Sequence, residues 1–223
     1  MVITNQIIVF VVFYMILLVC YLFSETSESF RRRAINKILL ASMFALYSFL
    51  TFARKGITTF DEIKLTAIFF AFTGDCCLLW NFVIGGIFFS IGDVLFILYE
   101  VLTAHSVGLL TEMWWAGIPF VILWGGYYFL EKKGILSGNH GLMFVRFLVL
   151  TTAQGCLGIS LAVVIGTPEM MLFGKGEALV MAGDYFLGFY HYHRYARTTK
   201  WVLRSNSFLY FAGMLMVALS VGL

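Results

Sequence analysis

The chain has 223 residues, of which 61% are apolar and 12% are charged, and its formal net charge is +3. Soluble domains carry about 25% charged residues, so composition excludes a water-soluble globular domain. The small, dispersed positive charge also excludes a nucleic-acid-binding surface. We expect an all-α, polytopic integral membrane protein whose outer surface contacts membrane lipid.

Apolar runs follow one another along the whole chain, separated by short polar stretches. A helix needs about 20 apolar residues to cross the hydrocarbon core of a bilayer. The sequence predicts about eight transmembrane helices, over residues 2–23, 35–52, 64–80, 82–104, 113–130, 142–165, 176–192 and 204–222. No linker divides them, so we expect a single integral membrane domain over residues 1–223. The first run has neither a basic leader nor a cleavage site, which predicts a retained helix rather than a signal peptide.

Lysine and arginine are distributed unequally over the two sides of this topology. The loops that follow the odd-numbered spans share one side, and their basic residues are Arg31, Arg32, Arg33, Lys132, Lys133, Arg194, Arg197, Lys200 and Arg204. The basic residues of the opposite side are Arg54, Lys55, Lys64 and Lys175. Because cytoplasmic loops carry the excess of basic residues, we expect both termini outside the cytoplasm. A multi-pass protein of the cell membrane is the localisation that this pattern favours.

A Gly-Asp-x-x-Leu motif occurs twice, around Asp75 and Asp184, and these aspartates are 109 residues apart. Lys37 precedes Asp75 by 38 residues, and Arg146 precedes Asp184 by the same distance. A base near the start of one span and an acid in the next therefore recur with one offset. This recurrence predicts two four-helix repeats in parallel orientation. The half-repeats would be residues 1–110 and 111–223.

Four carboxyl groups lie inside predicted spans: Asp75, Asp93, Glu100 and Asp184. A charged side chain at the centre of a membrane helix costs about 2.5–3.5 kcal/mol, so such residues are rare and mostly functional. With the predicted orientation, these acids and the bases of the two repeats can converge on one pocket that opens toward the cytoplasmic leaflet. The structural alternatives are that the bases only reach for the interface and that the acids only join helices by hydrogen bonds.

A metal site is not expected from the sequence. His191 and His193 lie in a basic loop beside tyrosines, which favours an interfacial role, and His105 and His140 are also loop residues. Cys76 and Cys77 are adjacent and lack the spacing of metal ligands. We therefore predict neither a metal nor a cofactor.

Several stretches resemble one known family. Residues 72–80 read FTGDCCLLW and are followed by FVIGGIFFSIGD up to Asp93, and residues 176–184 read GEALVMAGD. These segments, with Asn36-Lys37 before an apolar run, resemble the YhhN family of lysoplasmalogenase-like membrane proteins, which includes the transmembrane protein 86 enzymes. The resemblance covers roughly residues 35–222. Asp93 stands where the family commonly has His.

The resemblance implies hydrolysis of the vinyl ether bond of a lysoplasmalogen, a lysophospholipid, into a fatty aldehyde and a glycerophospho-alcohol. This reaction needs a protonated acid that delivers a proton to carbon, and an ionised carboxylate that stabilises the resulting cation and orients water. We predict Asp75 and Asp184 as this catalytic pair, with roles not assigned between them. Lys37 and Arg146 are predicted to bind the substrate phosphate.

Asp93 and Glu100 lie seven residues apart on one face of a predicted span and are predicted to line the substrate-binding cavity. Two other classes of function fit the same residues. A proton-coupled transporter of small molecules or lipids also uses parallel repeats and intramembrane acids. A scaffold or regulatory member of the family that lacks activity is the remaining alternative.

Overall fold

The computed structural model of the protein describes residues 5–55, 59–134, 141–192 and 200–221. These ranges contain eight α-helices, one 3-10 helix and no strand. In chain order the elements are α1 (Asn5–Ser24), α2 (Phe30–Lys55), α3 (Thr59–Leu78), α4 (Phe82–Ser106), η1 (Leu110–Ala116), α5 (Gly117–Lys132), α6 (Gly141–Ile165), α7 (Pro168–Tyr192) and α8 (Lys200–Ser220). The predicted all-α class and the number of eight main helices are confirmed.

Local sequence explains where these helices begin. The Asn81 side chain caps α4, because its oxygen accepts hydrogen bonds from the backbone N–H groups of Val83 and Ile84. Pro168 occupies the first position of α7, where its missing N–H costs nothing, and Glu169 lies in the positive first turn of that helix. α7 therefore starts well before residue 176, where the predicted apolar span begins, and extends into the polar flank.

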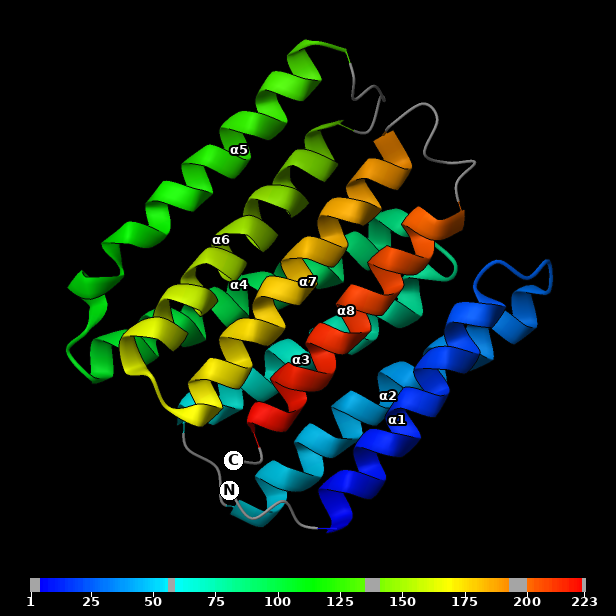
Figure 1. Ribbon diagram of the computed structural model, residues 1–223, viewed down its shortest axis with the longest axis horizontal. Coiled ribbons are helices and arrows are strands. Elements are labelled where there is room, and N and C mark those ends of the chain that lie inside the picture. Colours follow the sequence, from blue (N-terminus) through cyan, green and yellow to red (C-terminus); the bar gives the residue numbers. More distant parts are fainter. Residues whose placement is uncertain (1–4, 56–58, 135–140, 193–199, 222–223) are drawn as a thin grey trace.

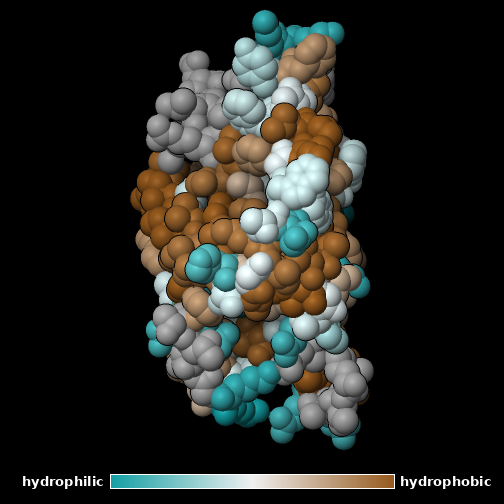
Figure 2. Space-filling model, turned by 90° about the vertical axis from the view of Figure 1, so that its left-hand side faces the viewer, coloured by the Kyte–Doolittle hydropathy of each residue, from teal (hydrophilic) through white to brown (hydrophobic). Residues whose placement is uncertain are grey.

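Five segments are long and apolar enough to cross a membrane: α1, α2, α4, Leu110–Leu130 and α8. α3 and α7 are of similar length, but they carry buried polar side chains that lower their hydropathy, among them Lys64, Asp75, Glu177 and Asp184. Figure 2 shows hydrophobic residues gathered across the middle of one face of the molecule and hydrophilic residues at its two ends. This distribution matches a bundle whose middle faces hydrocarbon. The chain is a multi-pass membrane protein.

α1 and α2 lie at one edge of the bundle and α5 at the other, with the remaining helices between them (Figure 1). α3 packs along α4, α7 packs along α8, and α4 and α7 both contact α6. The main core joins the first and last parts of the chain, since Tyr14 of α1 donates a hydrogen bond to the Phe211 carbonyl of α8 at 2.8 Å. The bundle is therefore closed by contacts between its ends in sequence.

The glycine of each Gly-Asp motif permits a close approach of neighbouring helices. A Cβ atom at Gly183 would lie 2.9 Å from the backbone nitrogen of Tyr210, so only glycine lets α7 come this near to α8. A Cβ atom at Gly74 would lie 2.8 Å from the ring of Phe89 in α4. At both motifs the glycine before the aspartate thus lies at a close contact between two helices.

The sidedness of the bundle stays a prediction, and labelling tests it. A cysteine introduced at Thr167, in the exposed turn between α6 and α7, should react with a membrane-impermeant thiol reagent added outside cells. A cysteine at Thr198, which lies outside the described residues, should react only after the membrane is permeabilised. A chain in which Cys20, Cys76, Cys77 and Cys156 are replaced supplies the background. The reverse pattern of labelling would place the basic loops outside.

Candidate functional site

A cavity of about 260 Å³ lies near one end of the bundle, where α1 and α3 end and where α4 and α8 begin. Its lining includes Leu78 at the end of α3, Phe82 at the start of α4 and Leu203 near the start of α8. In Figure 1 this end also carries the turn that joins α1 to α2. Its polar lining includes Tyr21, Glu25, Lys37, Asp75, Asp184 and Tyr210. Both halves of the chain therefore contribute to one site.

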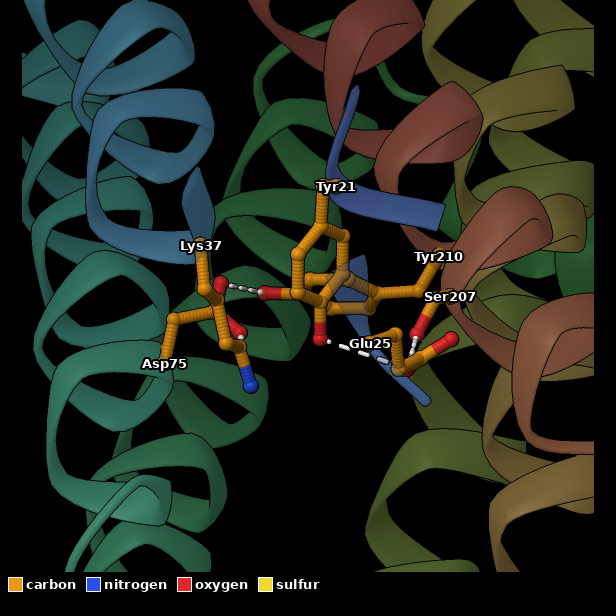
Figure 3. Close-up of polar contacts among 6 residues, drawn as sticks. All are labelled: Tyr21, Glu25, Lys37, Asp75, Ser207 and Tyr210. Carbon is orange, nitrogen blue, oxygen red and sulfur yellow. Dashed lines mark hydrogen bonds and ion pairs between the residues drawn. The ribbon is translucent and has the colours of Figure 1, made fainter. Parts of the chain in front are cut away.

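Asp75 lies in the last turn of α3 and accepts contacts on both carboxyl oxygens. Lys37 Nζ of α2 is 3.1 Å from Oδ1, and the Tyr210 hydroxyl of α8 donates a hydrogen bond to Oδ2 at 2.8 Å. Figure 3 shows both donors directed at this carboxyl group. Because Asp75 is only 2% exposed and its two partners both donate, the geometry suits an ionised carboxylate.

Glu25 forms a second polar group on the other side of the cavity (Figure 3). It follows α1 directly, and its Oε1 accepts hydrogen bonds from the Tyr21 hydroxyl, at 3.2 Å, and from the Ser207 hydroxyl. Glu25 is buried, and its Oε2 has no hydrogen-bond partner among the described residues. Burial raises the pKa of Glu25 from 4.5 to about 7, against the opposing effects of Ser207, Lys37, Tyr21 and Arg204.

Asp184 lies on α7 and lines the same cavity as Asp75 and Lys37. It is 5% exposed and lies beside the Thr151 side chain of α6. Among the described residues, the charged groups that act on it most strongly are the acidic Asp93 and Asp75. The two aspartates that the sequence predicts as a catalytic pair thus face one cavity, one with a cationic partner and the other with a hydroxyl partner.

The other predicted site residues lie elsewhere. Asp93 and Glu100 are buried in α4 and are not among the residues that line this cavity. Asp93 instead accepts a hydrogen bond from the Thr151 hydroxyl at 3.1 Å. Arg146 lies in α6, and its side chain is outside the described part of the structure, so its predicted contact with a phosphate stays a prediction.

Three cavity residues, Glu25, Ser207 and Tyr210, were not singled out from the sequence. Glu25 lies in a loop-like acidic and serine-rich stretch, where an exposed acid is the usual expectation. A weak signal exists in retrospect, because Tyr21 and Glu25 are four residues apart and so fall on one helix face. Tyr210 gives no such signal, since it lies among other aromatic residues of an apolar span.

This arrangement defines a class of protein: a multi-pass helical bundle with a buried, carboxyl-lined cavity at one end. The sequence model of the YhhN family matches residues 32–221, and the chain belongs to the YhhN family. Neither the curated proteins nor the solved structures that were compared give a match to this chain.

The raised pKa of Glu25 predicts how stability depends on pH. The folded protein holds the proton of Glu25 more tightly than the unfolded chain does, so its stabilising effect is complete below pH 4.5 and is lost as the pH rises through 7. We expect the free energy of unfolding to decrease over this window by about 3 kcal/mol. The thermal midpoint of the purified protein should fall accordingly. Glu25→Gln should remove that part of the pH dependence.

Glu28 supplies the matched control, because it lies in the same turn and is exposed. Glu28→Gln should leave the midpoint as a function of pH unchanged. A Glu25→Gln profile with the same slope as the wild-type profile would contradict the assignment to Glu25.

Proposed function

We propose that the protein is an integral membrane hydrolase that cleaves the vinyl ether bond of lysoplasmalogens. The observation that carries the proposal is the pairing of Asp75, held by Lys37 and Tyr210, with Asp184 across one cavity. Membership of the YhhN family supports it. A volume of about 260 Å³ is slightly below the usual range of small-molecule pockets, roughly 300–1,000 Å³. We expect it to take the reacting end of the lipid, with the alkyl chain between helices.

In the proposed reaction, Asp184 is the acid and Asp75 is the carboxylate. Asp184 delivers its proton to the outer carbon of the double bond, which is the carbon not bonded to the ether oxygen. Positive charge then develops on the inner carbon, which carries the ether oxygen, and on that oxygen itself. Asp75 stabilises this charge. Water then adds to the inner carbon and loses a proton to Asp75. This step yields a hemiacetal.

The hemiacetal collapses by breaking the bond between its carbon and the ether oxygen. Its hydroxyl proton moves to the departing oxygen, so the products are a fatty aldehyde and a glycerophospho-alcohol. One water molecule is consumed, and no net proton is consumed. The cycle closes when the proton taken up by Asp75 returns to Asp184, which is why the two groups must share one cavity.

Lys37 has two proposed roles in this scheme. It neutralises Asp75 in the resting protein, at 3.1 Å, and it is positioned at the cavity to attract the phosphate of an entering substrate. If the basic loops are cytoplasmic, the cavity opens toward the cytoplasmic leaflet. That orientation suits a lysophospholipid with its head group at the interface.

Purified protein supplied with a lysoplasmalogen in detergent micelles tests the proposal. We expect release of the long-chain aldehyde. The matched control is the lysophospholipid with a saturated ether in place of the vinyl ether, which should remain intact because it offers no carbon that the acid can protonate. Absence of aldehyde from the vinyl ether substrate would overturn the proposal.

A proton-coupled transporter is the second candidate, and the buried carboxyl groups of α4 and α7 behind the cavity favour it. Proteoliposomes with an imposed pH gradient distinguish the two functions. A carrier would accumulate its solute only with the gradient, whereas the hydrolase would release aldehyde with or without it.

A further inference from the structure

A second group of carboxyl side chains lies in the bundle behind the cavity. Glu100 of α4 is fully buried, and Glu177 of α7 is 1% exposed. Both carboxyl oxygens of Glu100 and Oε1 of Glu177 have no hydrogen-bond partner among the described residues. The remaining oxygen of Glu177 accepts a hydrogen bond from the Gln154 side chain of α6. The pair is thus rich in acceptors and poor in donors.

Gly158 of α6 brings the two glutamates to one place. A Cβ atom at this position would lie 2.9 Å from Oε1 of Glu100 and 2.8 Å from Cγ of Glu177. Both side chains therefore fill the space that the missing side chain of Gly158 leaves free. The two buried carboxyl groups interact electrostatically, so they repel each other when both are ionised, and a proton held between them removes that repulsion.

Among the described residues, the surroundings of the pair supply one positive charge. The positive charge of Lys64 on α3 acts on Glu177. The direct contacts of its ammonium group are a hydrogen bond donated to Ser220 at 2.7 Å and the ring of Phe173, whose centre lies 4.6 Å away. The other titratable neighbours are Cys156 of α6, Asp93 of α4 and Asp184 of α7, none of which brings a positive charge. One proton shared by two carboxyl groups leaves a charge of −1, which Lys64 balances.

Each glutamate of the pair lies two helical turns from an aspartate nearer the cavity. Glu100 follows Asp93 by seven residues on α4, and Asp184 follows Glu177 by seven on α7, which is about two helical turns, or roughly 10 Å, on each helix. Thr151 of α6 donates a hydrogen bond to Asp93 at 3.1 Å, and its side chain also lies beside Asp184. The four carboxyl groups therefore form two levels, of which the level of Asp184 reaches the cavity.

The single hydroxyl of Thr151 can donate only one hydrogen bond. When it donates to Asp93, its contact with Asp184 is a hydrogen bond only if Asp184 is protonated and donates. A protonated Asp184 that donates to Thr151 would link the cavity to the level of buried acids behind it.

We propose that Glu100 and Glu177 form a proton-binding site in the bundle core, which holds one proton between the two carboxyl groups and exchanges it with Asp184 through Asp93 and Thr151. The ligand is a proton rather than a metal ion. Within the described residues, no group of three or more His, Cys, Asp or Glu side chains is placed to hold a metal. The site lies between α4, α6 and α7, and its proton binding does not depend on whether the protein is a hydrolase or a carrier.

Infrared spectroscopy of the purified protein at pH 7.5 tests the site, because a protonated carboxyl group has a carbonyl band that is distinct from the bands of a carboxylate. Glutamate labelled with ¹³C at the side-chain carboxyl restricts the signal to glutamates, and a Glu25→Gln background removes the other buried glutamate of the described residues. We expect a band from a protonated glutamate. This band should shift only slowly after transfer to D2O, because a buried proton exchanges slowly with solvent. Glu100→Gln and Glu177→Gln should each change it, and the double variant should abolish it.

Glu62→Gln is the control variant, since Glu62 is exposed on α3, and it should leave the band intact. Absence of the band in the labelled protein that retains both glutamates would overturn the proposal, and this measurement requires no variant of the pair to fold. The thermal midpoint in sodium chloride is also compared with that in choline chloride. A higher midpoint in sodium chloride that disappears in Glu100→Gln would overturn the proton site in favour of a cation site. Equal midpoints in the two salts support a proton.

Discussion

Asp75→Asn and Asp184→Asn should each lower the turnover of a lysoplasmalogen by about two to four orders of magnitude, the range of a positioned acid or base. Asparagine keeps the size and polarity of each side chain but can neither deliver nor take up the proton. Aldehyde release by detergent-purified variants, compared at equal amounts of folded protein, measures the effect. Glu62→Gln, an exposed carboxyl change on α3, should retain wild-type turnover.

The same pair predicts the pH profile of turnover. One carboxyl group must be protonated and the other ionised, so the rate should fall on both sides of an optimum, and the two limbs belong to the pair rather than to single residues. Because the proposed slow step moves a proton to carbon, turnover should be slower in D2O. Full activity of both asparagine variants would refute the two-aspartate mechanism.

Lys37→Met should have the next largest effect, a loss of about 10- to 150-fold in kcat/KM, which corresponds to roughly 1.5–3 kcal/mol for a hydrogen bond to a charged group. The substitution leaves Asp75 buried without its cation. Lys37→Arg, which restores the charge, should recover part of the activity. Steady-state kinetics with a lysoplasmalogen provide the measurement.

The double variant Lys37→Met/Asp75→Asn separates the two roles of Lys37. If Lys37 acts only by keeping Asp75 ionised, the double variant should be no slower than Asp75→Asn. If Lys37 also binds the phosphate, KM should rise further in the double variant. An unchanged kcat/KM in Lys37→Met alone would assign Lys37 to the membrane interface.

The sequence predicted the fold class because composition leaves few solutions for a chain that must satisfy its backbone within lipid. It also predicted that Asp75 and Asp184 matter, since an acid in an apolar run is costly wherever it points. The direction of a side chain around its helix is harder to predict. Asp93 and Glu100 share a face of α4, as predicted, but that face meets α6 and α7 and not the cavity.

Helix ends and tertiary partners account for the rest of what the sequence left open. The sequence around Glu25 predicts an exposed turn. Glu25 is buried beside Ser207 only because α1 packs against α8. Tyr210 of α8 becomes a partner of Asp75 of α3 only when the bundle brings these two helices to the same cavity. Both contacts join residues more than 100 positions apart, a separation at which local patterns carry no information.

The family match begins at residue 32, yet Tyr21 and Glu25 of the preceding segment line the cavity. One wall of the site thus comes from a helix that lies outside the matched region, while Lys37 and Asp75 come from within it. An exchange of residues 1–28 for the corresponding segment of another family member is therefore a compact graft that reshapes one side of the cavity and retains the proposed chemistry. Under the proposed function, we expect changes in α1 to alter selectivity for a lipid head group separately from the two aspartates.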